Sequence, residues 1–174
     1  MRRICLVAGE GTFPLLFAER ARTHGCEVIA IALSGLTSER IVPLVAKVHW
    51  IAIGQVGKLI RILLLERARE VVLAGRVPKA LIHRPDVPRD ARANGLVSGR
   101  QGKGTAVLIT RVMDMLARIG VTVLDSTTFL EDQLAGEGVL NGLPVPERLM
   151  EDVRLGREVA REAARFDIGQ TVEI

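Results

Sequence analysis

Short apolar runs alternate along this chain with stretches in which apolar residues recur at helical spacing. The first run, residues 4–7, leads through a glycine-containing turn into a helical pattern that reaches Ala21. Comparable runs occupy residues 26–33, 47–53, 71–74 and 121–124. Runs that are apolar almost throughout are typical of strands buried on both faces. The alternation therefore predicts an α/β fold, with a Rossmann-like open parallel sheet and helices on both of its faces.

Later segments add further helices to this pattern. Residues 59–67 place leucine and isoleucine side chains on one stripe, and a longer helix is predicted from a capping Thr105 to Gly120. Prolines make the chain irregular after residue 77, and we expect a helical piece within residues 90–97. The last helix is predicted over residues 146–165, and residues 171–174 resemble the start of a strand.

Glycine and proline are concentrated between residues 131 and 146, which is typical of a connecting segment. We therefore predict a sheet domain over residues 1–130 and a linker over 131–146 that leads to the last helix. The apolar stripe of the last helix needs a cover, so pairing of two copies into a homodimer is a hypothesis.

The turn after the first run reads Ala8-Gly9-Glu10-Gly11-Thr12-Phe13-Pro14. A strand, a Gly-x-Gly turn and a helix are the first unit of many nucleotide-binding sheets. Pro14 suits the first helical turn, and the free N–H groups there suit a phosphate. A plain tight turn is the alternative interpretation, because Pro14 replaces the third glycine of the dinucleotide fingerprint.

Glycine and polar residues also follow other predicted strands, in loops 54–58, 75–79 and 125–128. The loops after parallel strands share the edge of the sheet where ligands bind. Backbone N–H groups together with lysine and arginine would form a cradle for a diphosphate. The alternative is that these are ordinary glycine-rich connections. The candidate substrate-binding residues are Gly9, Glu10, Gly11, Thr12, Gly54, Gly57, Lys58, Gly75, Arg76, Lys79, Lys103, Asp125, Ser126 and Thr127.

Charge changes this picture in one segment. The net charge is +4, and residues 79–104 hold six lysines and arginines against two aspartates, which is six minus two, or +4. Such a basic stretch suggests an anionic partner, either a phosphate group or membrane headgroups, and a solvated loop rich in arginine is the alternative. With no Tyr and one Trp, the chain lacks the aromatic platform of single-strand binders, so nucleic acid is not expected.

Several classes of protein are disfavoured by particular positions. Gly102-Lys103-Gly104-Thr105 lacks the Ser or Thr that directly follows the lysine of a Walker P-loop. No acidic residue ends the second apolar run, which disfavours a nicotinamide dehydrogenase. No apolar run approaches the roughly 18 residues of a membrane span. Two cysteines beside predicted core strands indicate reduced thiols, so the expected compartment is the cytoplasm.

Catalytic and metal-binding residues are not identified by spacing. The three histidines are scattered, and no nucleophile–base pair stands out. A Mg²⁺ ion held by one or two carboxylates and by substrate phosphates would need only residues such as Glu10 or Asp125. Each carboxylate could instead cap a turn.

Six motifs occur in a fixed order along the chain: I-C-L-V-A-G-E-G-T-F-P at 4–14, G-Q-V-G-K at 54–58, A-G-R-V-P at 74–78, D-S-T-T-F-L at 125–130, P-E at 146–147 and F-D-I-G-Q at 166–170. This ordered set resembles the LpxI-type UDP-2,3-diacylglucosamine pyrophosphatases, and the resemblance covers essentially the whole chain. Family members carry a second domain of comparable size with acidic residues for metal binding and chemistry. The resemblance therefore implies that residues 147–174 are the start of an incomplete second domain, and that this chain is an N-terminal part that lacks most of the catalytic residues.

The resemblance also implies a reaction in lipid A and lipopolysaccharide synthesis. Water attacks the diphosphate of UDP-2,3-diacylglucosamine in the presence of Mg²⁺, giving UMP and 2,3-diacylglucosamine 1-phosphate. The acyl chains imply a cytoplasmic protein peripheral to the inner membrane. A non-catalytic nucleotide-binding module and a basic nucleic-acid binder are the alternatives, and the lack of Tyr disfavours the second.

Overall fold

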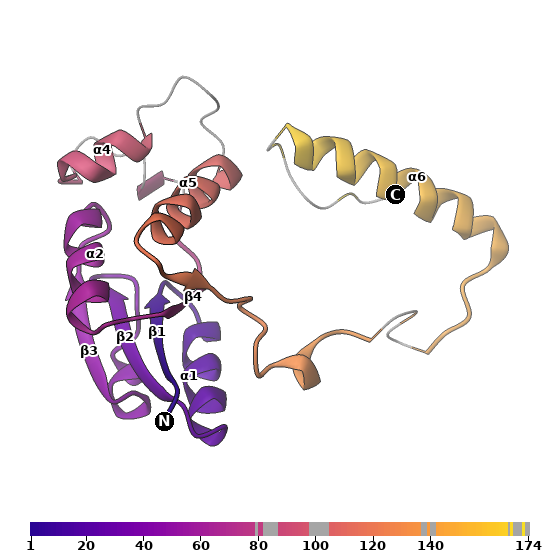
Figure 1. Ribbon diagram of the computed structural model, residues 1–174. Coiled ribbons are helices and arrows are strands. Elements are labelled where there is room, and N and C mark those ends of the chain that lie inside the picture. The colour runs from indigo at the N-terminus through magenta and orange to yellow at the C-terminus, as the bar shows by residue number, and fades with distance from the viewer. Residues whose placement is uncertain are drawn as a thin grey trace.

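Five parallel strands form a single sheet in the order β3-β2-β1-β4-β5 (Figure 1). The strands are β1 (Arg3–Ala8), β2 (Glu27–Leu33), β3 (Lys47–Ile51), β4 (Glu70–Ala74) and β5 (Thr122–Val123). β1 pairs with β2 on one side and with β4 on the other, so the order of connection reverses between β1 and β4. The predicted open parallel sheet is therefore confirmed, with the strand order of a doubly wound fold.

A computed structural model describes the chain at residues 1–78, 80, 81, 87–97, 105–136, 139, 142–166, 168 and 172. The helices are α1 (Phe13–Thr23), α2 (Val56–Leu65), α4 (Ala91–Val97), α5 (Thr105–Arg118) and α6 (Glu147–Arg165), with short 3-10 turns η1 (Glu39–Leu44) and η2 (Glu131–Gln133). Lys79, Lys103 and the predicted strand at 171–174 lie outside the described residues, Val172 excepted.

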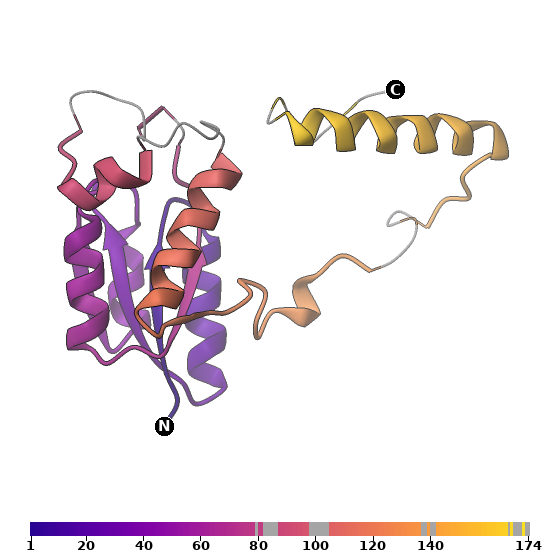
Figure 2. The same cartoon turned by 45° about the horizontal axis from the view of Figure 1, so that its top comes forward.

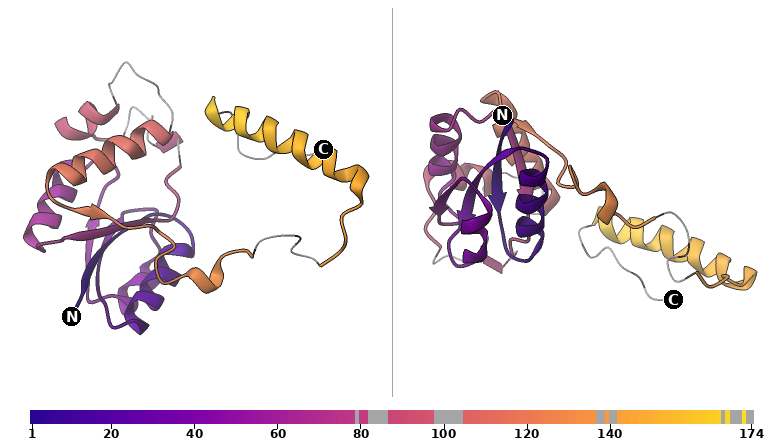
Figure 3. Two further views of the ribbon diagram at one scale, coloured as in Figure 1. Left: turned by 45° about the vertical axis from the view of Figure 1, so that its right-hand side comes forward. Right: turned by 90° about the horizontal axis from the view of Figure 1, so that it is seen from below.

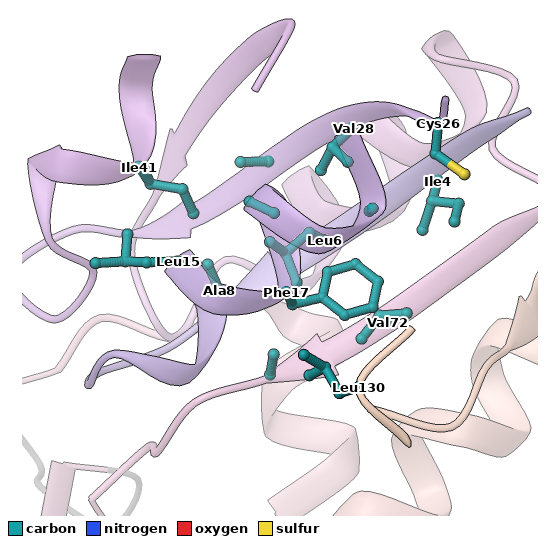
Figure 4. Packing of buried hydrophobic residues seen from close by; sticks show 14 residues of the cluster. Ile4, Leu6, Ala8, Leu15, Phe17, Cys26, Val28, Ile41, Val72 and Leu130 are labelled. Carbon is teal, nitrogen blue, oxygen red and sulfur yellow. The ribbon is translucent and has the colours of Figure 1, made fainter. Parts of the chain in front are cut away.

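Alternate residues of β1 contribute to two cores, one on each face of the sheet. Ile4 and Leu6 face α1 and pack with Phe17, whose side chain is fully buried there (Figure 4). Cys5 faces the opposite layer, which α2 and α5 cover with Leu63 and Leu116. This two-sided burial is why the strands read as continuous apolar runs rather than as alternating ones. Helices on both faces are thus confirmed as predicted.

The two cysteines are free and buried, as the sequence predicted. Cys5 lies in the centre of the sheet, where burial is the main cause that raises the pKa of its thiol to about 11. Its thiol is therefore protonated at neutral pH and poorly nucleophilic.

The chain after β5 packs back onto α1. Leu130 is buried in the core around Phe17, and Arg20 forms an ion pair with Asp132. Phe129, a non-glycine residue with φ of 70°, stacks on His24 with ring centroids 4.8 Å apart. These contacts continue to residue 132, so the first residues of the predicted linker are fixed to the sheet domain.

The last helix, α6, stands apart from the sheet in every view (Figures 1, 2 and 3). Apolar side chains along it, among them Leu149 and Val153, are exposed. The helix itself was predicted, and its bounds agree within one residue. Domain boundaries and pairing of two copies stay predictions.

Candidate functional site at the carboxyl edge of the sheet

The loops that follow β1 and β4 meet where the order of connection reverses. In open α/β sheets this position is the ligand-binding crevice. Glu10 and Arg76 join the two loops as an antiparallel bridge: the Glu10 N–H donates to the Arg76 carbonyl at 2.8 Å, and the Arg76 N–H donates to the Glu10 carbonyl at 2.9 Å. The loops are thereby held together before any ligand is bound.

Two glycines permit this close approach. A Cβ atom on Gly9 would lie 2.6 Å from the Arg76 carbonyl oxygen. A Cβ atom on Gly75 would lie 2.8 Å from the Glu10 carbonyl oxygen, and the Gly75 φ of +88° further disfavours a side chain. The geometry therefore explains both glycines by contact between the two loops.

Only part of the first turn can donate to a ligand. The Gly9 N–H donates to the Ala74 carbonyl at 2.8 Å, and the Glu10 N–H is used in the bridge. Across the described part of the chain, the N–H groups of Gly11, Thr12 and Phe13 have no hydrogen-bond acceptor. They stand at the start of α1, where the helix dipole favours an anion. The N–H groups of residues 11–13 can therefore donate to a phosphate, whereas those of the two residues before them are already used.

Arg76 adds a cation beside these donors. Its guanidinium contacts the Glu10 carboxylate at 3.1 Å, and its side chain is 74% exposed. An exposed pair of this kind contributes little to stability. The guanidinium can therefore exchange part of this contact for a ligand phosphate at small cost.

The second predicted loop, residues 54–58, serves a different purpose. A Cβ atom on Gly54 would overlap the Pro88 carbonyl oxygen, so glycine is needed for residues 88–90 to lie against this loop. Lys58 donates from its Nζ to the Trp50 carbonyl at 3.0 Å, at the β3 edge of the sheet. The structure thus places Lys58 away from Arg76, which lies at the reversal point beyond β1 and β4.

Asp90 is a key residue that the sequence analysis did not single out. Its Oδ2 accepts from the Gly57 N–H at 2.6 Å and its Oδ1 accepts from the Ala93 N–H at 2.8 Å. One carboxylate therefore caps both α2 and α4. The available signal was an aspartate directly before a helical segment, the usual N-cap residue.

The segment held by Asp90 forms one wall of a cavity of about 420 Å³. Its floor is made by the carboxyl ends of four strands, its walls by α2, α4 and α5, and its rim by the glycines of the three loops. The described side chains that line it are almost all apolar: Val7, Leu33, Ile51, Ile53, Val56, Leu59, Leu73, Val77, Leu81, Val87, Ala93, Leu96, Ile109 and Val112, with Gln55 and Arg89 as polar exceptions.

The fourth predicted loop does not reach this edge. β5 pairs only with Glu70 and Val71 at the start of β4, and the chain then turns toward the end of α1. Within the turn, Thr127 donates to the Asp125 carboxylate from its hydroxyl at 2.6 Å and from its N–H at 2.8 Å. These hydrogen bonds lower the pKa of Asp125. Asp125, Ser126 and Thr127 are thus separated from Gly9–Thr12, and a role for them in binding stays a prediction.

A family model described as the LpxI N-terminal domain matches residues 3–133, which is most of the chain. The chain belongs to this family. The LpxI N-terminal domain of this chain therefore comprises the whole sheet and the contacts of the following segment with α1. Four of the six motifs noted in the sequence lie within this extent, and those at 146–147 and 166–170 lie beyond it.

A curated relative, the UDP-2,3-diacylglucosamine pyrophosphatase LpxI of Caulobacter vibrioides, is 28% identical over 179 residues. The match covers 98% of this chain and 60% of the relative, so the chain spans well under two thirds of that protein's length. Two solved structures are also similar. The biotin carboxylase subunit of pyruvate carboxylase matches at 14% identity and TM-score 0.45, covering 94% of this chain and 28% of that one. The biotin carboxylase domain of a single-chain bacterial carboxylase matches at 8% identity and TM-score 0.46, covering 89% of this chain and 34% of that one.

Metal-ligating side chains are dispersed among the described residues of the LpxI N-terminal domain. Nowhere in them do three His, Cys, Asp or Glu side chains come together as ligands. Glu10 is paired with Arg76, and Asp125 is held within its own turn. The same part of the chain contains no helix with the length and apolar character to cross a bilayer.

Proposed function

We propose that this chain is the substrate-binding part of an enzyme that cleaves the diphosphate of UDP-2,3-diacylglucosamine in lipid A biosynthesis. The products are UMP and 2,3-diacylglucosamine 1-phosphate. Membership of the LpxI N-terminal domain family and the similarity to the Caulobacter enzyme support the proposal. We also propose that the enzyme acts at the inner face of the cytoplasmic membrane and is peripheral to the bilayer.

One observation carries the proposal. A crevice holds an arginine and three N–H groups that have no acceptor among the described residues, and it lies at the same edge of the sheet as a cavity lined by apolar side chains. Gly9 and Gly75 belong to both features. A diphosphate joined to acyl chains combines the two chemistries that these neighbouring features would bind.

This chain's own residues would bind and orient the substrate rather than complete the reaction. The N–H groups of Gly11, Thr12 and Phe13 would donate hydrogen bonds to the diphosphate oxygens, and Arg76 would offset the charge of those oxygens. The proposed Mg²⁺ would add charge neutralisation at the same phosphates. Because no three metal-ligating side chains come together among the described residues, we propose that residues 1–174 alone do not release UMP.

Equilibrium binding to three ligands tests the proposal: UDP-2,3-diacylglucosamine, UDP-glucosamine and 2,3-diacylglucosamine 1-phosphate. The intact lipid nucleotide should bind more tightly than either partial ligand, because it fills both features at once. An assay of UMP release with Mg²⁺ should remain at background. Equal binding of UDP-glucosamine and the lipid nucleotide would instead favour a non-catalytic nucleotide-binding module.

A further inference from the structure

The apolar cavity extends across the sheet instead of ending at the crevice. It begins beside Gly9 and Gly75 and continues over Leu33 of β2 to Ile51 of β3. Neighbouring strands lie about 4.8 Å apart, so a floor of four strands is roughly 14 Å long. The cavity therefore runs along the sheet in the direction that leads away from the proposed phosphate donors.

Burial distinguishes the two ends of the cavity. At the β2–β3 end, Leu33, Ile51, Leu59 and Ala93 are each less than one tenth exposed. At the other side Ile109 of α5 lines the cavity and is 47% exposed. The cavity is therefore closed under α2 and α4 and open near α5.

We infer that this cavity binds one unbranched acyl chain and selects it by length, with Ala93 at the closed end setting the limit. The inference rests on the proposed function, and it names the part of the substrate that this cavity would take. A linear chain fits because the lining offers almost no polar partner for a sugar, a base or a phosphate. Ala93 fits the limiting role because it is buried, lines the cavity from α4 and has a side chain of a single methyl group.

The α4 wall is positioned well enough to impose such a limit. Asp90 fixes the start of α4 through Gly57 and Ala93, and Arg111 of α5 donates from Nη1 to the Leu96 carbonyl at 2.6 Å. Both ends of this short helix are thus tied to neighbouring helices. A fixed wall gives a sharp limit on length, whereas a yielding wall would accept longer chains.

Titration calorimetry of the purified full chain with saturated fatty acids of increasing length tests the inference. Affinity should rise about fourfold with each added methylene while the chain still fits, and then level off. The variant Ala93→Leu should level off at a shorter chain and bind the shorter acids unchanged. A series without length dependence, or an unchanged limit in Ala93→Leu, would overturn the inference.

A charged residue at the open end provides a second test that leaves the core intact. Ile109→Glu should weaken fatty-acid binding at least tenfold, because it places a carboxylate at the mouth of the cavity. Met113→Glu is the matched control: Met113 lies one turn further along α5, is 42% exposed and is not among the described lining residues. Equal effects of the two variants would contradict the site.

UDP-glucosamine binding, measured on the same samples, separates the two proposals. If the native chain binds UDP-glucosamine but no fatty acid, the acyl site is overturned and the proposed function stands. Fatty-acid binding without UDP-glucosamine binding would support the acyl site and contradict the proposed function.

Discussion

Gly9 and Arg76 are in direct backbone contact across the point where the strand order reverses. A methyl group at Gly9 would lie 2.6 Å from the Arg76 carbonyl oxygen, which is closer than real Cβ atoms come to oxygen. The two loops of the crevice therefore pack as tightly as a protein interior. Their rigidity keeps the remaining donors of the first turn in place.

Gly9→Ala should lower the free energy of unfolding by about 2 kcal/mol, because the added methyl group forces the loops apart. Urea denaturation measures the change. Gly95→Ala is the control, since a Cβ atom there meets nothing within 4 Å and Gly95 lies inside α4. The Gly95→Ala variant should keep the same free energy of unfolding or raise it by up to about 1 kcal/mol, because alanine has the higher helix propensity. Equal effects of the two substitutions would contradict the packing argument.

Asp90→Ala should destabilise the wall of the cavity by about 2 kcal/mol, because it removes the caps of two helices. In the native protein the Gly57 and Ala93 amides donate to the Asp90 carboxylate. Hydrogen exchange at these two amides should therefore be faster in the variant. Asp114→Ala, an exposed position on α5, is the control and should leave both amides protected. Faster exchange in both variants would show that Asp90 has no special role.

Leu130→Ala should lower the free energy of unfolding by about 3 kcal/mol, which is the usual effect of truncating a fully buried leucine side chain. Leu130 is 1% exposed in the core beside Phe17, although it follows the last strand. Leu134→Ala provides the comparison, because Leu134 is 54% exposed and should be near neutral. Similar stabilities of the two variants would mean that the segment after β5 is not part of the folded sheet domain.

Glu66 gives a pH dependence with a definite sign. A hydrogen bond from Lys47 is the main cause that lowers the pKa of Glu66 below its ordinary 4.5, and a hydrogen bond from His49 lowers this pKa further. A lowered pKa contributes stability that is present above pH 4.5 and is lost as the pH falls through the lowered value. Glu66→Gln should therefore differ most from the native chain at neutral pH, and the difference should shrink on acidification. A stability difference that stays constant with pH would contradict this pairing.

The sheet could be predicted from the sequence because its strands are buried on both faces and therefore stand out as apolar runs. The glycine loops could be located for the same reason, since each one follows such a run. Their roles could not be separated, because a glycine that admits a ligand and a glycine that admits a neighbouring loop look alike in sequence. Gly9, Gly54 and Gly75 are all explained by contacts within the protein.

The cavity and its cap depend on contacts between distant segments. Asp90 and Gly57 are 33 residues apart, and no local pattern links them. Loop 125–128 does not lie at the carboxyl edge of the sheet, where the sequence predicts it. The reason is that β5 is two residues long, so the chain leaves the sheet before reaching that edge. Apolar periodicity predicts that a strand is present, but it does not predict how far the strand extends.

The central claim is that the crevice between β1 and β4 binds a diphosphate through residues 11–13. Titration of the ¹⁵N-labelled chain with UDP-glucosamine, followed by amide chemical shifts, tests it most directly. We predict saturable shifts at the amides of Gly11, Thr12 and Phe13, with smaller changes at Gly9 and Glu10, whose N–H groups are bonded within the protein. Saturable shifts confined to other loops, or no shifts at residues 11–13, would contradict the claim.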